Sequence, residues 1–174
     1  LPELNAYLGA IRKPHRVIRG LSHRVDALLK ADAERDRAFA AASSEMRLIK
    51  NEQEVRELSA VIASTKRGFE DVIATLKDST SERHVEGVFG LRARVEGNDV
   101  GYGTIAAAGH HACVLHWTRN DGELKKGDLL LLDAGVEGNS LYTADITRTL
   151  PISGRFSKEQ RTIYELVLRA LSLD

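Results

Sequence analysis

Asp133 and Asp145 are the residues of this 174-residue chain whose type and spacing best suit chemistry. Asp133 follows a run of four leucines, and Asp145 lies in a second strand-like segment, residues 142–149. A tight turn at residues 138–140 would join the two segments as a hairpin and place Asp133 directly opposite Asp145. Directly opposed side chains have Cβ atoms roughly 4.5–5.5 Å apart, where like charges repel. Such a pair needs a cation, and two divalent metal ions are the simplest candidate.

Each aspartate also has a structural interpretation. Asp133 could end a strand, and Asp145 could hydrogen-bond its own turn, as many aspartates do. A change of register by one residue would put the two carboxylates on opposite faces of the hairpin. The spacing alone therefore leaves both a structural and a metal-binding role open.

The kind of metal follows from the ligand atoms. Carboxylate oxygens suit hard or borderline divalent ions, and a site rich in carboxylates favours manganese. Two such ions would lower the pKa of a bridging water and polarise a substrate carbonyl. The expected cofactors are therefore two divalent metal ions, Mn²⁺ first, with Zn²⁺ and Co²⁺ as alternatives.

His116 is the third residue of interest. We expect a strand over residues 112–118, in which His116 shares a face with Val114. A histidine in such a strand can titrate near neutral pH, bind a metal or hydrogen-bond a reacting oxygen. A core histidine with satisfied hydrogen bonds is the alternative. His110 and His111 are adjacent and would point to opposite faces of a strand, so we interpret them as a loop.

Helices must hold these strands in place. Residues 55–76 carry apolar side chains at helical spacing through about seven turns, which predicts a long amphipathic helix after Asn51. The run Ser79-Thr80-Ser81 is expected to end this helix and to cap a second one, which ends at a left-handed stop at Gly97-Asn98. The residues Ser157 to Gln160 form a capping box that opens a final helix. The expected order is helix, helix, four strands and helix, with strands over residues 102–107, 112–118, 129–135 and 142–149.

Composition limits the class of protein. Apolar residues make up 43% and charged residues 29% of the chain, which is typical of a globular rather than a disordered protein. Lys plus Arg and Asp plus Glu number 25 each, so the formal net charge is zero, and we expect no nucleic-acid partner and no membrane surface. No apolar run approaches the roughly 20 residues that cross a bilayer. The single cysteine, Cys113, cannot form an internal disulfide, which favours a reducing, cytoplasmic compartment.

The ends of the chain suggest a piece of a longer protein. The chain begins with Leu1-Pro2, its only methionine is Met46, and it stops at Asp174 directly after a helical pattern. We expect such a piece to expose apolar surface where the rest of the protein packs. Association of the chain with itself would follow.

Several motifs, in the right order, resemble those of the pita-bread metallopeptidases. The Xaa-Pro aminopeptidases (aminopeptidase P) are the closest match and the prolidases are near. The motifs are MRLIK at 46–50, GYGTI at 101–105, LHW at 115–117, LDAG at 132–135, YTADITRT at 142–149 and GRFS at 154–157. This resemblance implies an α/β (α+β) fold class, the first half of a pita-bread fold, with long helices packed on a mostly antiparallel curved sheet. Residues 46–174 would be the N-terminal half of the catalytic domain, and residues 1–45 a C-terminal remnant of an N-terminal domain plus its linker.

The resemblance also implies a function. Members of the family remove the N-terminal residue of peptides with proline at the second position, using two metal ions that activate a bridging water, and a homo-oligomer is expected for the full-length protein. By position, Asp133 and Asp145 resemble two of the metal ligands. His116 resembles the histidine that binds substrate and steadies the tetrahedral intermediate. Tyr102 resembles a tyrosine that supports a ligand aspartate, and Thr147 is expected behind the ligands, where it would help to orient them.

The chain departs from the family pattern in two ways. The spacing from Asp133 to Asp145 is one residue longer than usual, which we assign to the turn at residues 138–140. The remaining ligands, a histidine and two glutamates, belong to the second half of the fold, so this chain alone is expected to hold metals weakly and to be inactive. A prolidase, which cleaves only dipeptides, and a pita-bread scaffold that binds partners without catalysis are the alternatives.

Overall fold

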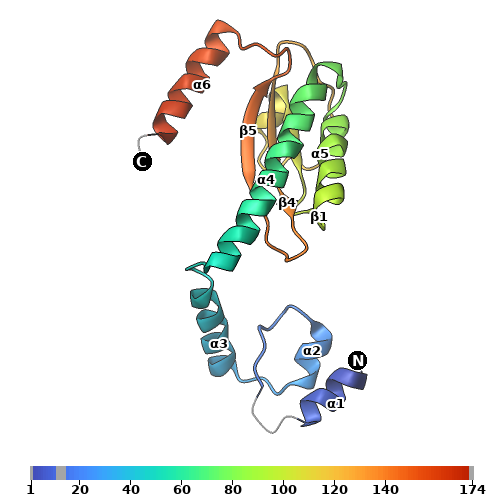
Figure 1. Ribbon diagram of the computed structural model, residues 1–174, viewed down its shortest axis with the longest axis vertical. Helices are drawn as coiled ribbons and strands as arrows, with labels where there is room; N and C mark the ends of the chain where they lie inside the picture. The colour runs from blue at the N-terminus through green and yellow to red at the C-terminus, as the bar shows by residue number, and fades with distance from the viewer. Residues whose placement is uncertain (1, 11–14, 173–174) are drawn as a thin grey trace. The chain divides into compact units, whose positions relative to one another are not determined.

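The chain divides into two compact units, Leu1–Asn51 and Glu52–Asp174, in a computed structural model that describes residues 2–10 and 15–172 (Figure 1). The terminal residues Leu1 and Asp174, on which the expectation of a longer protein rests in part, lie outside the described residues. The interpretation of residues 1–45 as the remnant of another domain stays a prediction. Each unit is described separately below.

In its described residues, 2–10 and 15–51, the first unit contains three helices joined by loops. They are α1 (Pro2–Ala10), α2 (His23–Leu28) and α3 (Ala33–Met46). Asp32 caps α3, because its side chain accepts a hydrogen bond from the backbone N–H of Arg35. The guanidinium of Arg19 donates to Asp36 at 3.0 Å and to the backbone oxygen of Asp26 at 2.8 Å. This one side chain therefore links the loop before α2 to α3.

The second unit contains the predicted long helices. They are α4 (Glu52–Thr75), followed by the short 3₁₀ helix η1 (Leu76–Asp78), then α5 (Glu82–Glu96) and α6 (Lys158–Leu171). Ser81 accepts a hydrogen bond from the backbone N–H of His84 at the start of α5. Ser157 and Gln160 form the reciprocal capping box at the start of α6. The predicted serine caps are thus confirmed, with Ser81 as the capping residue of its run. The predicted left-handed stop at Gly97 is wrong, because Gly97 ends α5 with an extended backbone, φ −135°.

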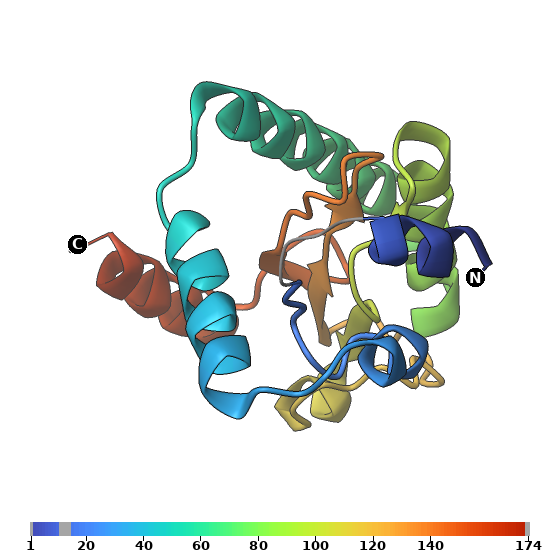
Figure 2. The ribbon, with the colours of Figure 1, turned by 90° about the horizontal axis from the view of Figure 1, so that it is seen from below.

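A three-stranded antiparallel sheet in the order β2-β3-β5 lies beside these helices. Its strands are β2 (Ile105–Ala108), β3 (Leu129–Ala134) and β5 (Ile146–Pro151), and a separate pair joins β1 (Asp99–Val100) to β4 (Val136–Glu137). Figures 1 and 2 show α4 and α5 side by side on one face of the sheet. The core between them contains Phe69, Val72, Val85, Phe89, Leu130, Leu132 and Ala134. The predicted α/β class with antiparallel strands is confirmed.

Side chains alternate along β3, and this alternation places Asp133. Leu130, Leu132 and Ala134 are fully buried under the helices, so Asp133 points to the opposite face of the sheet. That face carries no covering helix from the α4–α5 pair. Asp133 therefore stays accessible at the end of an otherwise buried strand.

The register of the hairpin differs from the prediction by two residues. Asp133 pairs with Thr147 rather than with Asp145, and Glu137 bridges to Thr143. The loop has three residues, 139–141, and its last residue, Leu141, is left-handed with φ 66°. A type I turn followed by one left-handed residue is a common hairpin connection, but leucine rarely occupies that conformation, so nothing in the sequence marked it. A shift of two residues keeps both aspartates on the same face.

Gly135 separates β3 from β4 between the two aspartates. A Cβ atom at Gly135 would lie 1.6 Å from the backbone oxygen of Ala144, so only glycine lets the two chain segments come this close. The N–H of Val136 donates to the buried hydroxyl of Thr65 on α4 at 2.9 Å. A helix side chain therefore replaces a sheet partner where the ladder is interrupted.

The predicted strand over residues 112–118 is wrong. Residues Gly109–Cys113 form a 3₁₀ helix, η2, and a turn follows in which His116 is left-handed with φ 54°. The predicted face shared by Val114 and His116 does not exist, and Leu115 is 85% exposed. Gly109, with φ 56°, turns the chain out of the sheet directly after β2. The apolar pattern of the segment is that of a strand, but the backbone is held by hydrogen bonds from elsewhere in the unit.

Candidate metal-binding site

Asp133, Asp145 and Tyr102 converge on one point. The hydroxyl oxygen of Tyr102 lies 2.6 Å from Oδ1 of Asp133 and 3.0 Å from Oδ1 of Asp145. Tyr102 comes from the segment between β1 and β2, Asp133 from β3, and Asp145 from the residue before β5. The fold thus brings together three predicted site residues that are far apart in the sequence.

The Tyr102 hydroxyl has one proton to share between two carboxylates. Burial raises the pKa of Tyr102 well above its ordinary value, and its hydrogen bonds to Asp133 and then Asp145 raise the pKa further. The hydroxyl is therefore protonated at any physiological pH and donates to one carboxylate at a time. Neither Oδ2 atom has a hydrogen-bond partner among the described residues. The two carboxyl groups consequently face each other across one hydroxyl group. Their Oδ2 atoms are left to accept other partners.

The donor set fits part of a metal site. Free carboxylate oxygens on two neighbouring side chains are ligands that hard divalent ions accept. Within residues 2–10 and 15–172, no group of three or more His, Cys, Asp and Glu side chains is placed to hold a metal ion. Asp133 and Asp145 could therefore supply two ligands of such a site.

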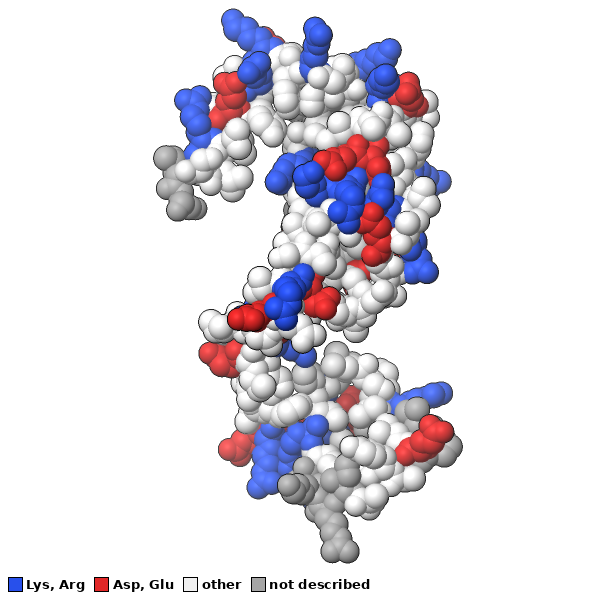
Figure 3. Space-filling view, in the orientation of Figure 1, with Lys and Arg blue, Asp and Glu red and all other residues white. Residues whose placement is uncertain are grey.

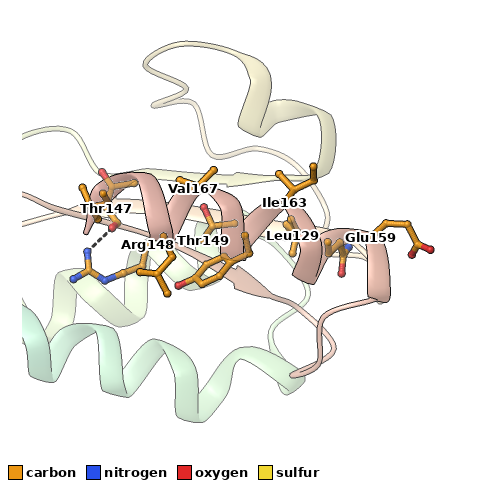
Figure 4. A pocket seen from close by; sticks show the side chains of 11 residues that line it. Leu129, Thr147, Arg148, Thr149, Glu159, Ile163 and Val167 are labelled. Atoms are coloured by element: carbon orange, nitrogen blue, oxygen red, sulfur yellow. Dashed lines mark hydrogen bonds between the residues drawn. The ribbon is translucent and has the colours of Figure 1, made fainter. Parts of the chain in front are cut away.

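Thr147 lies beside the acidic pair on β5. It is the cross-strand partner of Asp133 and is exposed. On the same strand, Thr147 and Thr149 border a groove of about 650 Å³ between β5 and the apolar face of α6, which includes Ile163 and Val167 (Figure 4). The acidic pair thus lies at one end of an open, largely apolar face.

His116 is not brought into contact with the acidic pair. Its side chain is exposed on the loop after η2, and no hydrogen bond links it to Asp133 or Asp145 in the part of the chain that is described. A Cβ added at Gly103, however, would lie 3.3 Å from the methyl group of Thr118. The His116 loop therefore packs against the residue that follows Tyr102.

Two buried polar residues near this loop were missed from the sequence. Glu82 is fully buried at the start of α5, and Asn120 is fully buried in the loop after His116. An acidic residue in the first turn of a helix ordinarily complements the helix dipole at the surface, and an Asn-Asp-Gly run ordinarily marks an exposed turn. Neither pattern carried a signal that these side chains face inward.

Lys and Arg side chains lie intermixed with Asp and Glu over α4 and α5 (Figure 3). Among the described helices, none combines the length and apolar character needed to cross a bilayer.

The known proteins to which this chain is similar in sequence include several Xaa-Pro aminopeptidases. The chain is 56% identical over 172 residues to Xaa-Pro aminopeptidase 1 of Streptomyces coelicolor, a match that covers 97% of this chain and 35% of that protein. It is 42% identical over 128 residues to the Xaa-Pro aminopeptidase of Haemophilus influenzae, covering 73% of this chain and 30% of that one. The chain therefore spans about a third of the length of these curated relatives.

Solved structures agree with the sequence relatives. A variant of Escherichia coli aminopeptidase P in complex with substrate superimposes with a TM-score of 0.80 at 28% identity, covering 98% of this chain and 43% of that one. Proline aminopeptidase P II from Yersinia pestis gives a TM-score of 0.78 at 29% identity. The predicted resemblance to the pita-bread aminopeptidases is confirmed. The model of metallopeptidase family M24 matches residues 30–173, and the chain belongs to that family.

Proposed function

We propose that this chain contributes one side of the active site of a Xaa-Pro aminopeptidase. The convergence of Asp133 Oδ1 and Asp145 Oδ1 on the Tyr102 hydroxyl carries the proposal. Two facing carboxylates repel each other, and a cation between them would remove this repulsion. The names of the relatives supply the substrate class, a peptide whose second residue is proline.

Each residue then has a defined task. Asp133 and Asp145 hold the metal ions, of which we propose two, Mn²⁺ in preference to Zn²⁺ or Co²⁺. The chemistry that such ions would supply, when bound, is a lowered pKa of a water molecule and a polarised peptide carbonyl. Tyr102 fixes the orientation of Asp133 through its 2.6 Å hydrogen bond. Thr147 stands next to Asp133 on β5 and limits its movement, and His116 offers its exposed imidazole to the substrate carbonyl as a hydrogen-bond donor.

Metal binding by the chain itself is the first test. Isothermal titration with MnCl₂ should give a dissociation constant of about 1 mM, because two carboxylates form an open site. Asp133→Asn and Asp145→Asn should each abolish the signal. Asp78→Asn removes an exposed carboxylate elsewhere in the unit and should leave it unchanged. Equal binding by all four proteins would contradict the proposed site, and parallel titrations with Zn²⁺ and Co²⁺ test the preference for manganese.

Activity is tested in an exchange enzyme, in which this chain replaces the matching 172-residue segment of the Streptomyces coelicolor relative. We expect hydrolysis of Xaa-Pro-Xaa tripeptides with Mn²⁺, and a loss of about 10³-fold in kcat for Asp145→Asn, which is about 4 kcal/mol of the barrier. The chain alone should be inactive. Cleavage restricted to Xaa-Pro dipeptides would instead indicate a prolidase. A folded exchange enzyme with neither metal binding nor turnover would indicate a scaffold.

A further inference from the structure

Glu82 is a fully buried carboxylate that the proposed reaction does not use. Its Oε1 accepts hydrogen bonds from the backbone N–H of Ala108 and from Nδ1 of His111, both at 2.8 Å. Its Oε2 accepts from the indole N–H of Trp117 at 2.9 Å and from the backbone N–H of Gly122 at 2.7 Å. Four donors thus converge on one side chain.

These donors are spread along a single segment of the chain. Ala108 ends β2, His111 lies in η2, Trp117 directly follows His116, and Gly122 ends the loop. The rings of His111 and Trp117 also stack, with centroids 3.9 Å apart. Glu82 therefore fixes both ends and the middle of the segment that contains His116.

The contacts require a carboxylate rather than an amide. Burial by itself would raise the pKa of Glu82, but the hydrogen bonds from Ala108, Trp117, His111 and Gly122 outweigh burial and lower it. Glu82 is consequently ionised and accepts at both oxygens. Glutamine has one accepting oxygen and an NH₂ group, so two of the four donors would face another donor.

The same segment is also hydrogen-bonded to β2, the strand that pairs with the strand carrying Asp133. Asn120 accepts from the N–H of Ala106 at 3.0 Å and donates to the backbone oxygen of Thr104 at 2.8 Å. Between these two residues, Ile105 is the cross-strand partner of Asp133. The loop is thus attached to β2 at the level of the proposed metal ligand.

We propose that Glu82 is a positioning residue, which holds residues 114–122, and with them His116, in a fixed place on the strand that pairs with Asp133. The left-handed backbone at His116 is disfavoured for a non-glycine residue, and the bonds from Glu82 to Trp117 and Gly122 maintain it. The catalytic value of this arrangement rests on the function proposed above. The arrangement itself is a property of the chain and can be measured without activity.

The first experiment uses the fluorescence of the chain. Trp117 is the only tryptophan, so its emission reports directly on the loop. Glu82→Gln should shift the emission to longer wavelength and increase acrylamide quenching about threefold, because the indole loses its partner and becomes exposed. The NMR signal of the His116 ring should also move. Glu123→Gln, an exposed change beside the same loop, is the matched control and should alter neither signal. Far-UV circular dichroism checks that all variants remain folded.

The second experiment measures coupling to His116 in the exchange enzyme. Glu82→Gln should lower kcat about tenfold with KM within about twofold, since a displaced loop misaligns the reacting groups. In a His116→Ala background the same change should lower kcat less than twofold, because no side chain is left to position. Trp117→Phe removes one donor while keeping an aromatic ring and should give a smaller loss with the same dependence on His116. This variant also tests the proposal if Glu82→Gln prevents folding.

The outcomes separate the two proposals. An unchanged Trp117 spectrum in folded Glu82→Gln, or an equal loss of kcat with and without His116, would overturn the positioning role. If the exchange enzyme cleaves no proline peptide but the fluorescence and His116 signals change as expected, the function fails and the loop-holding role of Glu82 stands. If Asp145→Asn abolishes activity and Glu82→Gln has no effect, the function stands and the positioning role fails.

Discussion

A single proton between two carboxylates is the central fact at the scale of residues. The Tyr102 hydroxyl lies within hydrogen-bond distance of both Asp133 and Asp145 but can donate to only one of them. In the absence of a cation, one carboxylate therefore faces a phenol oxygen and a second negative charge. The cost is moderate because Asp145 is exposed and water screens the repulsion.

Asp145→Asn should therefore stabilise the metal-free chain slightly. Removing one of two facing charges relieves about 0.5 kcal/mol of repulsion, which urea denaturation monitored by circular dichroism can detect as a higher midpoint. The same substitution should remove the stabilisation that Mn²⁺ gives to the unsubstituted chain. A marked loss of stability would mean that Asp145 has a structural hydrogen-bonding role instead. Asp78→Asn provides the comparison for removal of an exposed charge.

At the scale of elements, α4 and α5 are joined by a cluster of ion pairs as well as by the core. Arg67 on α4 donates to Glu96 on α5, and Arg92 on α5 donates both to Glu96 and to Asp71 on α4. The Arg67 hydrogen bond is the main cause that lowers the pKa of Glu96 from its ordinary value of 4.5 to about 2. The helix pair is consequently sensitive to acid.

The stability of the second unit should fall as the pH is lowered from about 5 to about 2. Because the pKa of Glu96 is lower in the folded state than in the unfolded state, its contribution is fully present above pH 4.5 and is lost as the pH falls through about 2. Glu96→Gln should flatten the dependence of the free energy of unfolding on pH in this window, and Glu123→Gln should not. Identical pH profiles for the two variants would show that Glu96 is not the group responsible. High salt should weaken the effect.

The helices and strands also show which parts of the fold the sequence predicts correctly. Helical spacing and serine caps predicted α4, α5 and α6, because an amphipathic helix is defined by local periodicity and by its own termini. The same local reasoning failed for residues 112–118. Their apolar character is that of a strand, but Glu82, distant in sequence, holds them as η2 and a loop. The hairpin register failed for a related reason, since Leu141 adopts a left-handed conformation that its type does not suggest.

The candidate site was predicted in part. Asp133 and Asp145 were expected to lie together, and they do, but diagonally rather than directly opposite. A register shift of two residues leaves each side chain on the same face of its strand. The prediction that the two aspartates share a face is therefore correct although the predicted register is wrong. The burial of Glu82 and Asn120 could not be predicted from the sequence, because a buried polar residue depends on hydrogen-bond partners that only the folded chain brings near. The role of Asp133 and Asp145 as ligands stays a prediction.

At the scale of the whole molecule, the apolar face of α6 that borders the groove beside β5 stays largely exposed among the described residues. Ile163, Val167 and Leu171 recur at helical spacing and are 62%, 63% and 76% exposed. The groove beneath them, against Thr147 and Thr149, is also largely apolar (Figure 4). Contiguous apolar surface of this kind ordinarily marks an interface.

The chain should therefore associate with itself, as expected from its sequence. Sedimentation velocity should show a weight-average mass that rises with protein concentration in the micromolar range. Val167→Lys should weaken this association about tenfold, or about 1.4 kcal/mol, by placing a charge in the apolar face. Thr162→Lys adds the same charge at an exposed polar position of α6 and should have little effect. A compact monomer at all concentrations would contradict the expectation.

The close passage of Gly135 past Ala144 has one more consequence. Regular ladder pairing would set a standard distance between the two acidic side chains, but the ladder stops at this crossing. The distance between Asp133 and Asp145 is set instead by how closely the backbone at Gly135 can approach the backbone at Ala144. A methyl group introduced at Gly135 must drive Ala144 outward and carry its neighbour Asp145 with it. The separation of the two carboxyl groups thus depends on the absence of a side chain at Gly135.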